Sequence, residues 1–373
     1  MSNEVKFLAT GDFHGNEFVL DQIVELAIRE KAGFVLFNGD LTPKKDVAIT
    51  EDRKAFNDLF YDLDELEKFT PEKIKRYLAG RVCDSVSEAL REGRFLVDLS
   101  KTGITLESLT TEKGARVLQR FAYGLNYGKP QTDFLKNRFI KYLERLKEAR
   151  IKVVSILGND DDADAAIVMR RLQEEGLLQY VNLSSIEIVE GIKIFGFNYC
   201  HKTDFGFYPH WEKPEAELFN LLTDFLKNQD LNKTTIGLFH DAPKDTHLDI
   251  TLGKEHIGSA AIRKFITLPR ESEYRDTSFF QNLLLTVHGN IHEAPYVSRR
   301  FMQTYRQLRT VSVNPGGEHK SVETLVREPR NPSEKYFADV VIINLRHVRG
   351  NQYRIDYMKH TKPQLFCKRV VKQ

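Results

Sequence analysis

The chain has 373 residues, of which 41% are hydrophobic, so it can bury a large core and is long for a single domain. Its 55 lysines and arginines nearly balance 53 aspartates and glutamates, and a formal net charge of +2 gives no global basic field for nucleic acid, although local patches stay open. The three widely spaced cysteines match neither a disulfide framework nor a zinc-ligand pattern, and the sequence has no secretory leader or membrane-span pattern, so we expect a cytoplasmic protein without a membrane partner.

Five short apolar runs bounded by glycine predict buried strands. In chain order they are residues 5–9, 34–37, 151–157, 235–239 and 283–287. Each run ends in polar residues that can bind a metal ion. These polar tips are Asp12-Phe13-His14, Asn38-Gly39-Asp40, Gly158-Asn159-Asp160, His240 and Gly289-Asn290-Ile291-His292. Because ligand sites in open α/β sheets gather at the carboxyl ends of strands, we expect the five tips to meet in one crevice.

The first tip leads into a predicted amphipathic helix that begins near Asn16. Apolar residues recur along one side of it, at Val19, Leu20, Ile23, Val24 and Ala27. A helix N-terminus binds anions through its free amides and its dipole. Asn16 is therefore predicted to orient a substrate phosphate, and a simple helix cap is the alternative.

Residues 44–150 interrupt the strands and are predicted to be a helical insertion in a core made of residues 1–43 and 151–373. Apolar residues recur at helical spacing over 56–69 and 135–146, and two further helices are predicted over 74–96 and 112–125. The insertion could be a cap that selects the substrate. It could also be a docking surface for a protein partner or a second copy of the chain, or a layer that extends the core.

The last part of the chain contains two more predicted helices and a hairpin. One helix runs from Asp161 to about Glu175, where the preceding Asn159 and Asp160 could also act as caps. The other opens at Gly258 and Ser259 and leaves two alternatives for His256 and Ser259, which either line the mouth of a pocket or only shape their loop. Residues 338–345 and 352–358 predict a closing hairpin, and the basic tail after it is expected to be solvated.

The residue types at the tips suit a site with two metal ions. Carboxylates and the amide oxygen are hard donors for Mn²⁺ or Mg²⁺, and imidazole extends the range to Fe, Zn or Ni. Two ions held roughly 3.5–4 Å apart can activate a hydroxide and neutralise the charge of a phosphate. A cap or turn role is the ordinary alternative for each residue taken alone. His288 is expected to be structural.

The order of the motifs resembles the calcineurin-like metallophosphoesterase family, whose pattern is D-x-H, G-D, G-N-(H/D), a lone H and G-H-x-H. The resemblance covers the start of the chain and most of residues 151–316. It implies a two-sheet α/β/β/α sandwich, here with a large helical insertion. It also implies hydrolysis of phosphate monoesters or diesters by a hydroxide activated by two divalent ions, with Mn²⁺ expected and Mg, Fe, Zn or Ni as alternatives. The implied metal ligands are Asp12, His14 and His292 for the first ion, Asp40 as the bridge, and Asn159, His240 and Asn290 for the second.

Two positions depart from the family pattern. Asn290 stands where the family has a histidine, and its weaker oxygen ligand would favour a harder or more labile second ion. Asp160 stands where many members have the histidine that protonates the leaving group. The general acid could then be Asp160, Asp161, another histidine or water, and acidic leaving groups would be favoured. The predicted catalytic residues are Asp40, Asn159, Asp160 and Asn16.

We expect a phosphorylated small molecule or a nucleotide as substrate, with two alternatives. A catalytically impaired interaction scaffold with this fold is permitted by Asn290, but a scaffold has no need for buried, converging carboxylates and imidazoles. A nuclease would need a basic strip with aromatic platforms beside the site, which the sequence neither shows nor excludes.

Overall fold

A computed structural model describes residues 4–43, 131–202, 211–227, 233–251, 253–268, 282–305, 308–320 and 336–361. The chain divides into two compact units, Met1–Thr42 with Phe134–Gln373, and Pro43–Asp133. All elements given below belong to the first unit. The helices predicted over 56–69, 74–96 and 112–125 lie outside the described residues, so the role of the insertion stays a prediction.

Six strands form a first, mixed sheet. They are β1 (Glu4–Thr10), β2 (Phe34–Asn38), β3 (Lys152–Ile156), β4 (Gln179–Tyr180), β15 (Val340–Arg349) and β16 (Gln352–Thr361). Their order is β16-β15-β1-β2-β3-β4. The strands β1 to β4 are parallel, and β15 pairs antiparallel with both β1 and β16. The hairpin predicted at the end of the chain is therefore confirmed as β15 and β16, and it pairs with the first strand.

Six strands form a second mixed sheet. They are β5 (Ser184–Val189), β6 (Ile192–Phe197), β9 (Thr234–Phe239), β10 (Leu283–Val287), β11 (Met302–Thr304) and β12 (Val311–Val313). Their order is β11-β12-β10-β9-β6-β5, with β6, β9, β10 and β12 parallel and the two edge strands antiparallel. Two small ribbons join β7 (Cys200–His201) to β8 (Glu212–Lys213) and β13 (Glu318–Lys320) to β14 (Tyr336–Ala338).

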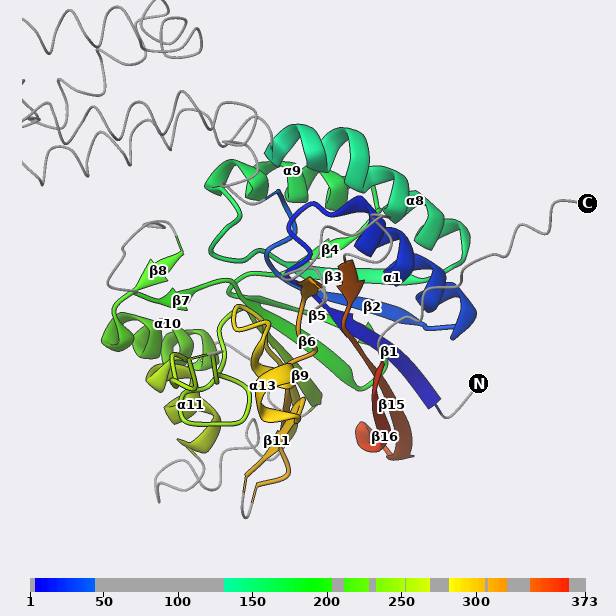
Figure 1. The fold of residues 1–373 in the computed structure, drawn as a ribbon. Coiled ribbons are helices and arrows are strands. Elements are labelled where there is room, and N and C mark those ends of the chain that lie inside the picture. Colours follow the sequence, from blue (N-terminus) through cyan, green and yellow to red (C-terminus); the bar gives the residue numbers. More distant parts are fainter. Residues whose placement is uncertain are drawn as a thin grey trace, which may run out of the picture. The chain divides into compact units, whose positions relative to one another are not determined.

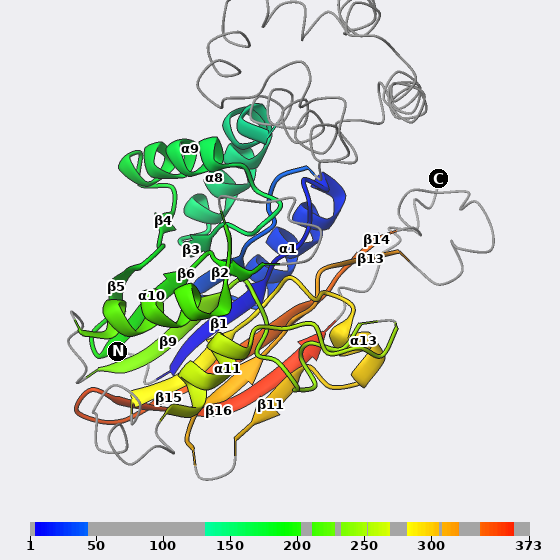
Figure 2. The same cartoon turned by 90° about the vertical axis from the view of Figure 1, so that its left-hand side faces the viewer.

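Helices cover the outer face of each sheet (Figures 1 and 2). On the first sheet lie α1 (Glu17–Arg29), the π-helical turn η2 (Leu135–Phe139), α8 (Ile140–Glu148) and α9 (Ala163–Glu174). On the second lie α10 (Glu215–Lys227) and α11 (Ala260–Thr267), while the short α13 (Ala294–Ser298) follows β10. The layers are α/β/β/α, which confirms the predicted fold class. Among the described helices, none is long and apolar enough to cross a membrane.

The central strands β2 and β9 are buried along their whole length because both faces of each sheet are covered there. In β1, Leu8 packs against the helices of the first sheet. Its neighbours Phe7 and Ala9 face the second sheet, in one cluster with Ile236 and Leu285. Alternate side chains of a strand point to opposite faces, so the central strands β1, β2, β3, β9 and β10 each contribute to two hydrophobic clusters. The sandwich therefore fixes the positions at which its strands end.

The helix predicted over 135–146 is confirmed as η2 and α8, and it packs on the core. Its buried residues Leu135, Phe139, Leu143 and Leu146 share one cluster with α1 and α9. Although the sequence places this segment in the insertion, its contacts assign it to the same unit as the two sheets.

Candidate metal centre

The loops that carry the predicted ligands have an unusual backbone. Asp12, His14, Asp40 and Asn290 all have positive φ, at 50°, 46°, 50° and 64°. Non-glycine residues seldom adopt this conformation, and residues that do are concentrated at functional sites. Backbone hydrogen bonds hold it, because the Asp12 N–H donates to the Gly39 carbonyl at 2.9 Å and the His14 N–H to the Asp40 carbonyl at 3.0 Å. The loops after β1 and β2 are therefore locked side by side.

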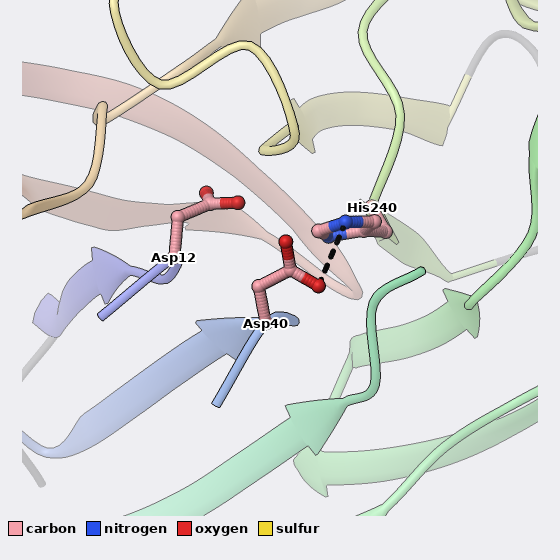
Figure 3. A group of neighbouring side chains, drawn as sticks. All are labelled: Asp12, Asp40 and His240. Carbon is pink, nitrogen blue, oxygen red and sulfur yellow. Dashed lines mark ion pairs between the residues drawn. The ribbon is translucent and has the colours of Figure 1, made fainter. Parts of the chain in front are cut away.

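A first group of ligand atoms belongs to Asp12, Asp40 and His240, which come from the ends of β1, β2 and β9 and point toward one another (Figure 3). One ligand atom from each lies within 4.8 Å of the others, and all three residues are buried. The Nε2 atom of His240 lies 3.3 Å from Asp40 Oδ1 and 2.9 Å from the amide oxygen of Asn159. The other ring nitrogen lies 2.9 Å from the carbonyl oxygen of Asn38, to which it donates, and this fixes the ring.

A second group consists of His14, Asp40 and Asp160, again with one ligand atom each within 4.8 Å of the others. His14 Nε2 lies 4.0 Å from Asp40 Oδ2, and His14 Nδ1 lies 3.7 Å from Asp160 Oδ2. The Asp160 N–H donates to Asp40 Oδ1 at 2.9 Å, which anchors the loop after β3 to the same carboxylate. Asp40 thus belongs to both groups.

Asp40 is an anion at neutral pH even without a metal ion. Burial by itself would raise its pKa, but the neighbouring His240 and His14 outweigh burial and hold the pKa well below its usual range. A buried carboxylate and an imidazole in contact stabilise the charged forms of each other. The ionised Asp40 therefore makes this site favourable for a cation.

His292 and Asn290, in the loop after β10, lie beside these two groups. The His292 ring lies edge-on to that of His14, with 6.0 Å between ring centroids. The Asn290 backbone N–H donates to Asp12 Oδ1 at 3.0 Å, and its side-chain Nδ2 donates to Asp241 Oδ1 at 3.3 Å. Since its Nδ2 faces that carboxylate, the amide oxygen of Asn290 faces away from it.

The buried Asp241 is a residue that the sequence analysis missed. It accepts hydrogen bonds from the backbone N–H of His201 at 2.9 Å and of Ala242 at 2.8 Å, and its Oδ2 lies 2.6 Å from His201 Nδ1. Burial would lower the pKa of His201, but the Asp241 carboxylate raises it to about 9. Asp241 therefore orients the amide of Asn290 while it is neutralised by His201. Its position directly after His240 was the available signal.

Asp161 has a structural role that distinguishes it from its neighbour Asp160. Its carboxylate accepts hydrogen bonds from Thr42 Oγ1 at 2.6 Å, from Thr42 N at 2.8 Å, from Gly158 N at 2.9 Å and from Leu41 N at 3.1 Å. Burial, followed by the nearby Asp40 carboxylate, raises the pKa of Asp161 to about 6, and the hydrogen bonds oppose this. The carboxylate joins the loop after β2 to the loop after β3.

The helix caps are also assigned. The helix predicted from Asp161 begins at Ala163, with Asp162 as its N-cap, so neither Asn159 nor Asp160 has this role. The side-chain oxygen of Asn16 caps α1, accepting from Phe18 N at 3.1 Å and Val19 N at 3.2 Å. A phosphate-orienting role for Asn16 stays a prediction.

The remaining predicted candidates shape their loops. His288 is buried, with ring nitrogens 2.8 Å from the Asp241 carbonyl oxygen and from Thr286 Oγ1, and burial lowers its pKa to about 4, so it is neutral. His256 Nδ1 lies 2.7 Å from the buried Asp249, and Ser259 is the N-cap of α11. These contacts are structural.

The donor set fits two divalent ions. Ligand atoms bound at roughly 2.0–2.2 Å to one ion stand about 3–4 Å apart. In each of the two groups, one ligand atom from every residue lies within 4.8 Å of the others. Two Asp/His groups that share one carboxylate provide the charge and the borderline N/O character that such ions prefer.

A Gly158→Ala variant is expected to lose metal binding at least tenfold. An added Cβ would lie 2.2 Å from Asp40 Oδ1 and 2.4 Å from His240 Cε1, so the shared carboxylate and the imidazole would have to move. Calorimetric titration of chelator-treated protein with Mn²⁺ measures the loss. The matched control is Gly33→Ala, at the opposite end of β2, where the added Cβ has ordinary contact at 3.5 Å with Lys6 O. Equal Mn²⁺ affinity in both variants would contradict the geometry.

Comparison with known proteins gives structural neighbours only. No protein-family model and no curated protein matches the sequence. One crystal structure aligns with 96% of this chain and 99% of its own at 12% identity and a TM-score of 0.50. TT1561 of Thermus thermophilus aligns with 96% of this chain and 99% of its own at 12% identity (TM-score 0.43). A dimetal phosphatase from Danio rerio aligns with 96% and 98% at 9% identity (TM-score 0.40). At such identities the likeness concerns the fold alone, and function has to be argued from the residues.

Proposed function

We propose that this protein is a metal-dependent hydrolase of phosphate monoesters or diesters. The observation that carries the proposal is the buried Asp40 carboxylate, which belongs to two ligand groups at once. A mononuclear site or a structural ion pair does not need a carboxylate shared in this way. Buried carboxylates and imidazoles are costly unless they are paired or bind metal, which argues against a pure scaffold.

The residues of the site would have three roles, which are to bind metal ions, to orient the ligands and to bind phosphate. Asp12, His14, Asp40, Asn159, His240, His292 and Asn290 would hold two divalent ions, which supply positive charge for the phosphate and activate the attacking water. Asp241 would orient the Asn290 amide, and His240 is oriented through the carbonyl of Asn38. The N-terminus of α1, which the Asn16 side chain caps, would attract a phosphate oxygen through the helix dipole.

The ions that we propose are Mn²⁺, because the set mixes carboxylate and amide oxygens with imidazole. The substrate is proposed to be a phosphorylated small molecule or a nucleotide. No histidine follows Asn159, so we expect esters with acidic leaving groups to be hydrolysed fastest.

The test is hydrolysis of p-nitrophenyl phosphate and bis-p-nitrophenyl phosphate by chelator-treated protein with and without Mn²⁺. We expect turnover only with the metal, and the preferred ester identifies the substrate as a monoester or a diester. An Asn290→His variant measures how far the amide weakens the second ion, because imidazole binds borderline ions more strongly. The proposal would be overturned in favour of a scaffold if the wild type and Asn290→His both bound Mn²⁺ but hydrolysed neither these esters nor any of a panel of nucleotides.

A further inference from the structure

The loop after β3 presents two consecutive acidic residues, and the structure gives them different environments. Asp161 is buried, and its carboxylate is occupied by N–H and O–H donors of Leu41, Thr42 and Gly158. The Asp160 carboxylate lies beside His14 and Asp40, with one ligand atom of each residue within 4.8 Å of the others. This position would let Asp160 share a metal ion with them.

We propose that Asp160 is a metal ligand that holds an ion together with His14 and Asp40. The proposal rests on the proposed function and concerns one residue of the same site. It gives a role to the Asp160 carboxylate, for which the sequence allowed either catalysis or helix capping.

Three contacts support ligation. Asp160 Oδ2 is 3.7 Å from His14 Nδ1, which suits two atoms bound to one ion. The Asp160 N–H donates to Asp40 Oδ1 at 2.9 Å, and this hydrogen bond holds the loop of Asp160 next to the Asp40 carboxylate. The Asp160 side chain is only 14% exposed. A divalent ion between the Asp160 and Asp40 carboxylates would offset their mutual repulsion.

The added carboxylate changes the ion that the site prefers. Asn290 contributes an amide where an imidazole is expected, and Asp160 adds a third carboxylate to Asp12 and Asp40. The ligand set then has more oxygen and more negative charge, which favours Mn²⁺ or Mg²⁺ over Zn²⁺. The two departures from the family pattern act in the same direction.

The experiment measures binding, independent of turnover. Chelator-treated wild-type and Asp160→Asn proteins are titrated with Mn²⁺ by calorimetry and electron paramagnetic resonance. We expect two ions in the wild type. In the isosteric variant, one of them should bind at least about 10–100-fold more weakly, as losses of metal-site interactions do. The control is Asp162→Asn, which alters the α9 cap two residues away and should leave both affinities unchanged.

A second variant tests ligation directly. In Asp160→Cys, a thiolate would favour a softer ion, so Cd²⁺ should bind more tightly than in the wild type and produce the thiolate–cadmium absorption band in the ultraviolet. The band identifies the side chain as a ligand even if the variant is less stable. Its absence in folded Asp160→Cys with Cd²⁺ bound would overturn the proposal.

The remaining outcomes are also decisive. Unchanged binding of both Mn²⁺ ions by Asp160→Asn, with slower hydrolysis only of esters that have poor leaving groups, would establish an acid role and overturn ligation. Two ions in the wild type, one in Asp160→Asn and no turnover of any ester would support ligation while defeating the hydrolase. Failure of the wild type to bind two ions would overturn both.

Discussion

An Asp40→Asn variant is expected to lose metal-dependent ester hydrolysis by a factor of at least about 10²–10³, the size that loss of one preorganised electrostatic contact has. Asp40 is the carboxylate common to both ligand groups, so its charge acts on both ions. An amide has the same shape but neither the charge nor a second oxygen donor. Turnover of p-nitrophenyl esters with Mn²⁺ measures the loss, and Mn²⁺ titration should show weakened binding as well.

The fold should survive this substitution. Asparagine tolerates the positive φ of 50° at position 40, and the backbone carbonyl that accepts the His14 N–H is unchanged. Asp21→Asn is the matched control, because this carboxylate is 53% exposed on α1 and pairs with Arg145. The circular dichroism spectra of the two folded variants should agree, whereas Asp40→Asn should unfold at a lower temperature, because the buried His240 and His14 lose their charged partner. Full activity in folded Asp40→Asn would refute the assignment of Asp40.

An Asp161→Ala variant is expected to lower the free energy of unfolding by about 3–5 kcal/mol, because removing one partner leaves several buried donors without an acceptor. The donors are the backbone N–H groups of Leu41, Thr42 and Gly158 and the hydroxyl of Thr42. These groups lie in the loops that carry Asp40 and Asn159. The variant should therefore also bind Mn²⁺ more weakly, although Asp161 is not a ligand. Urea unfolding of metal-free protein measures the stability.

Two control variants distinguish the link that Asp161 makes between the two loops from the loss of one hydrogen bond or of a helix cap. Thr42→Val removes only the hydroxyl that donates at 2.6 Å and should cost about 1–2 kcal/mol. Asp162→Ala removes the N-cap of α9 and should cost about 1 kcal/mol without affecting metal binding. If Asp161→Ala were no less stable than Asp162→Ala, the carboxylate would not be the link between the two loops.

Local patterns determined much of this protein. The five apolar runs are strands β1, β2, β3, β9 and β10, and the helices predicted after Asn16 and after Gly258 are α1 and α11. Short runs of β-branched and aromatic residues between glycines leave few alternatives to a buried strand. The parallel arrangement then brings the polar tips to one edge. The patterns alone predicted strands with converging polar ends, and the resemblance of their motifs to a known family supplied the fold class.

Only the tertiary structure decided how the side chains share their partners. Asp12 and His240 are 228 positions apart and meet at Asp40, whereas the adjacent Asp160 and Asp161 differ completely in environment. The same holds for Asp241, which joins His201 to Asn290 and which no motif singled out. Spacing along the chain determines which strand end a residue occupies. Which atoms come within hydrogen-bond or ligand distance depends on the packing of two sheets and on left-handed turns, and these arise from contacts between distant parts of the chain.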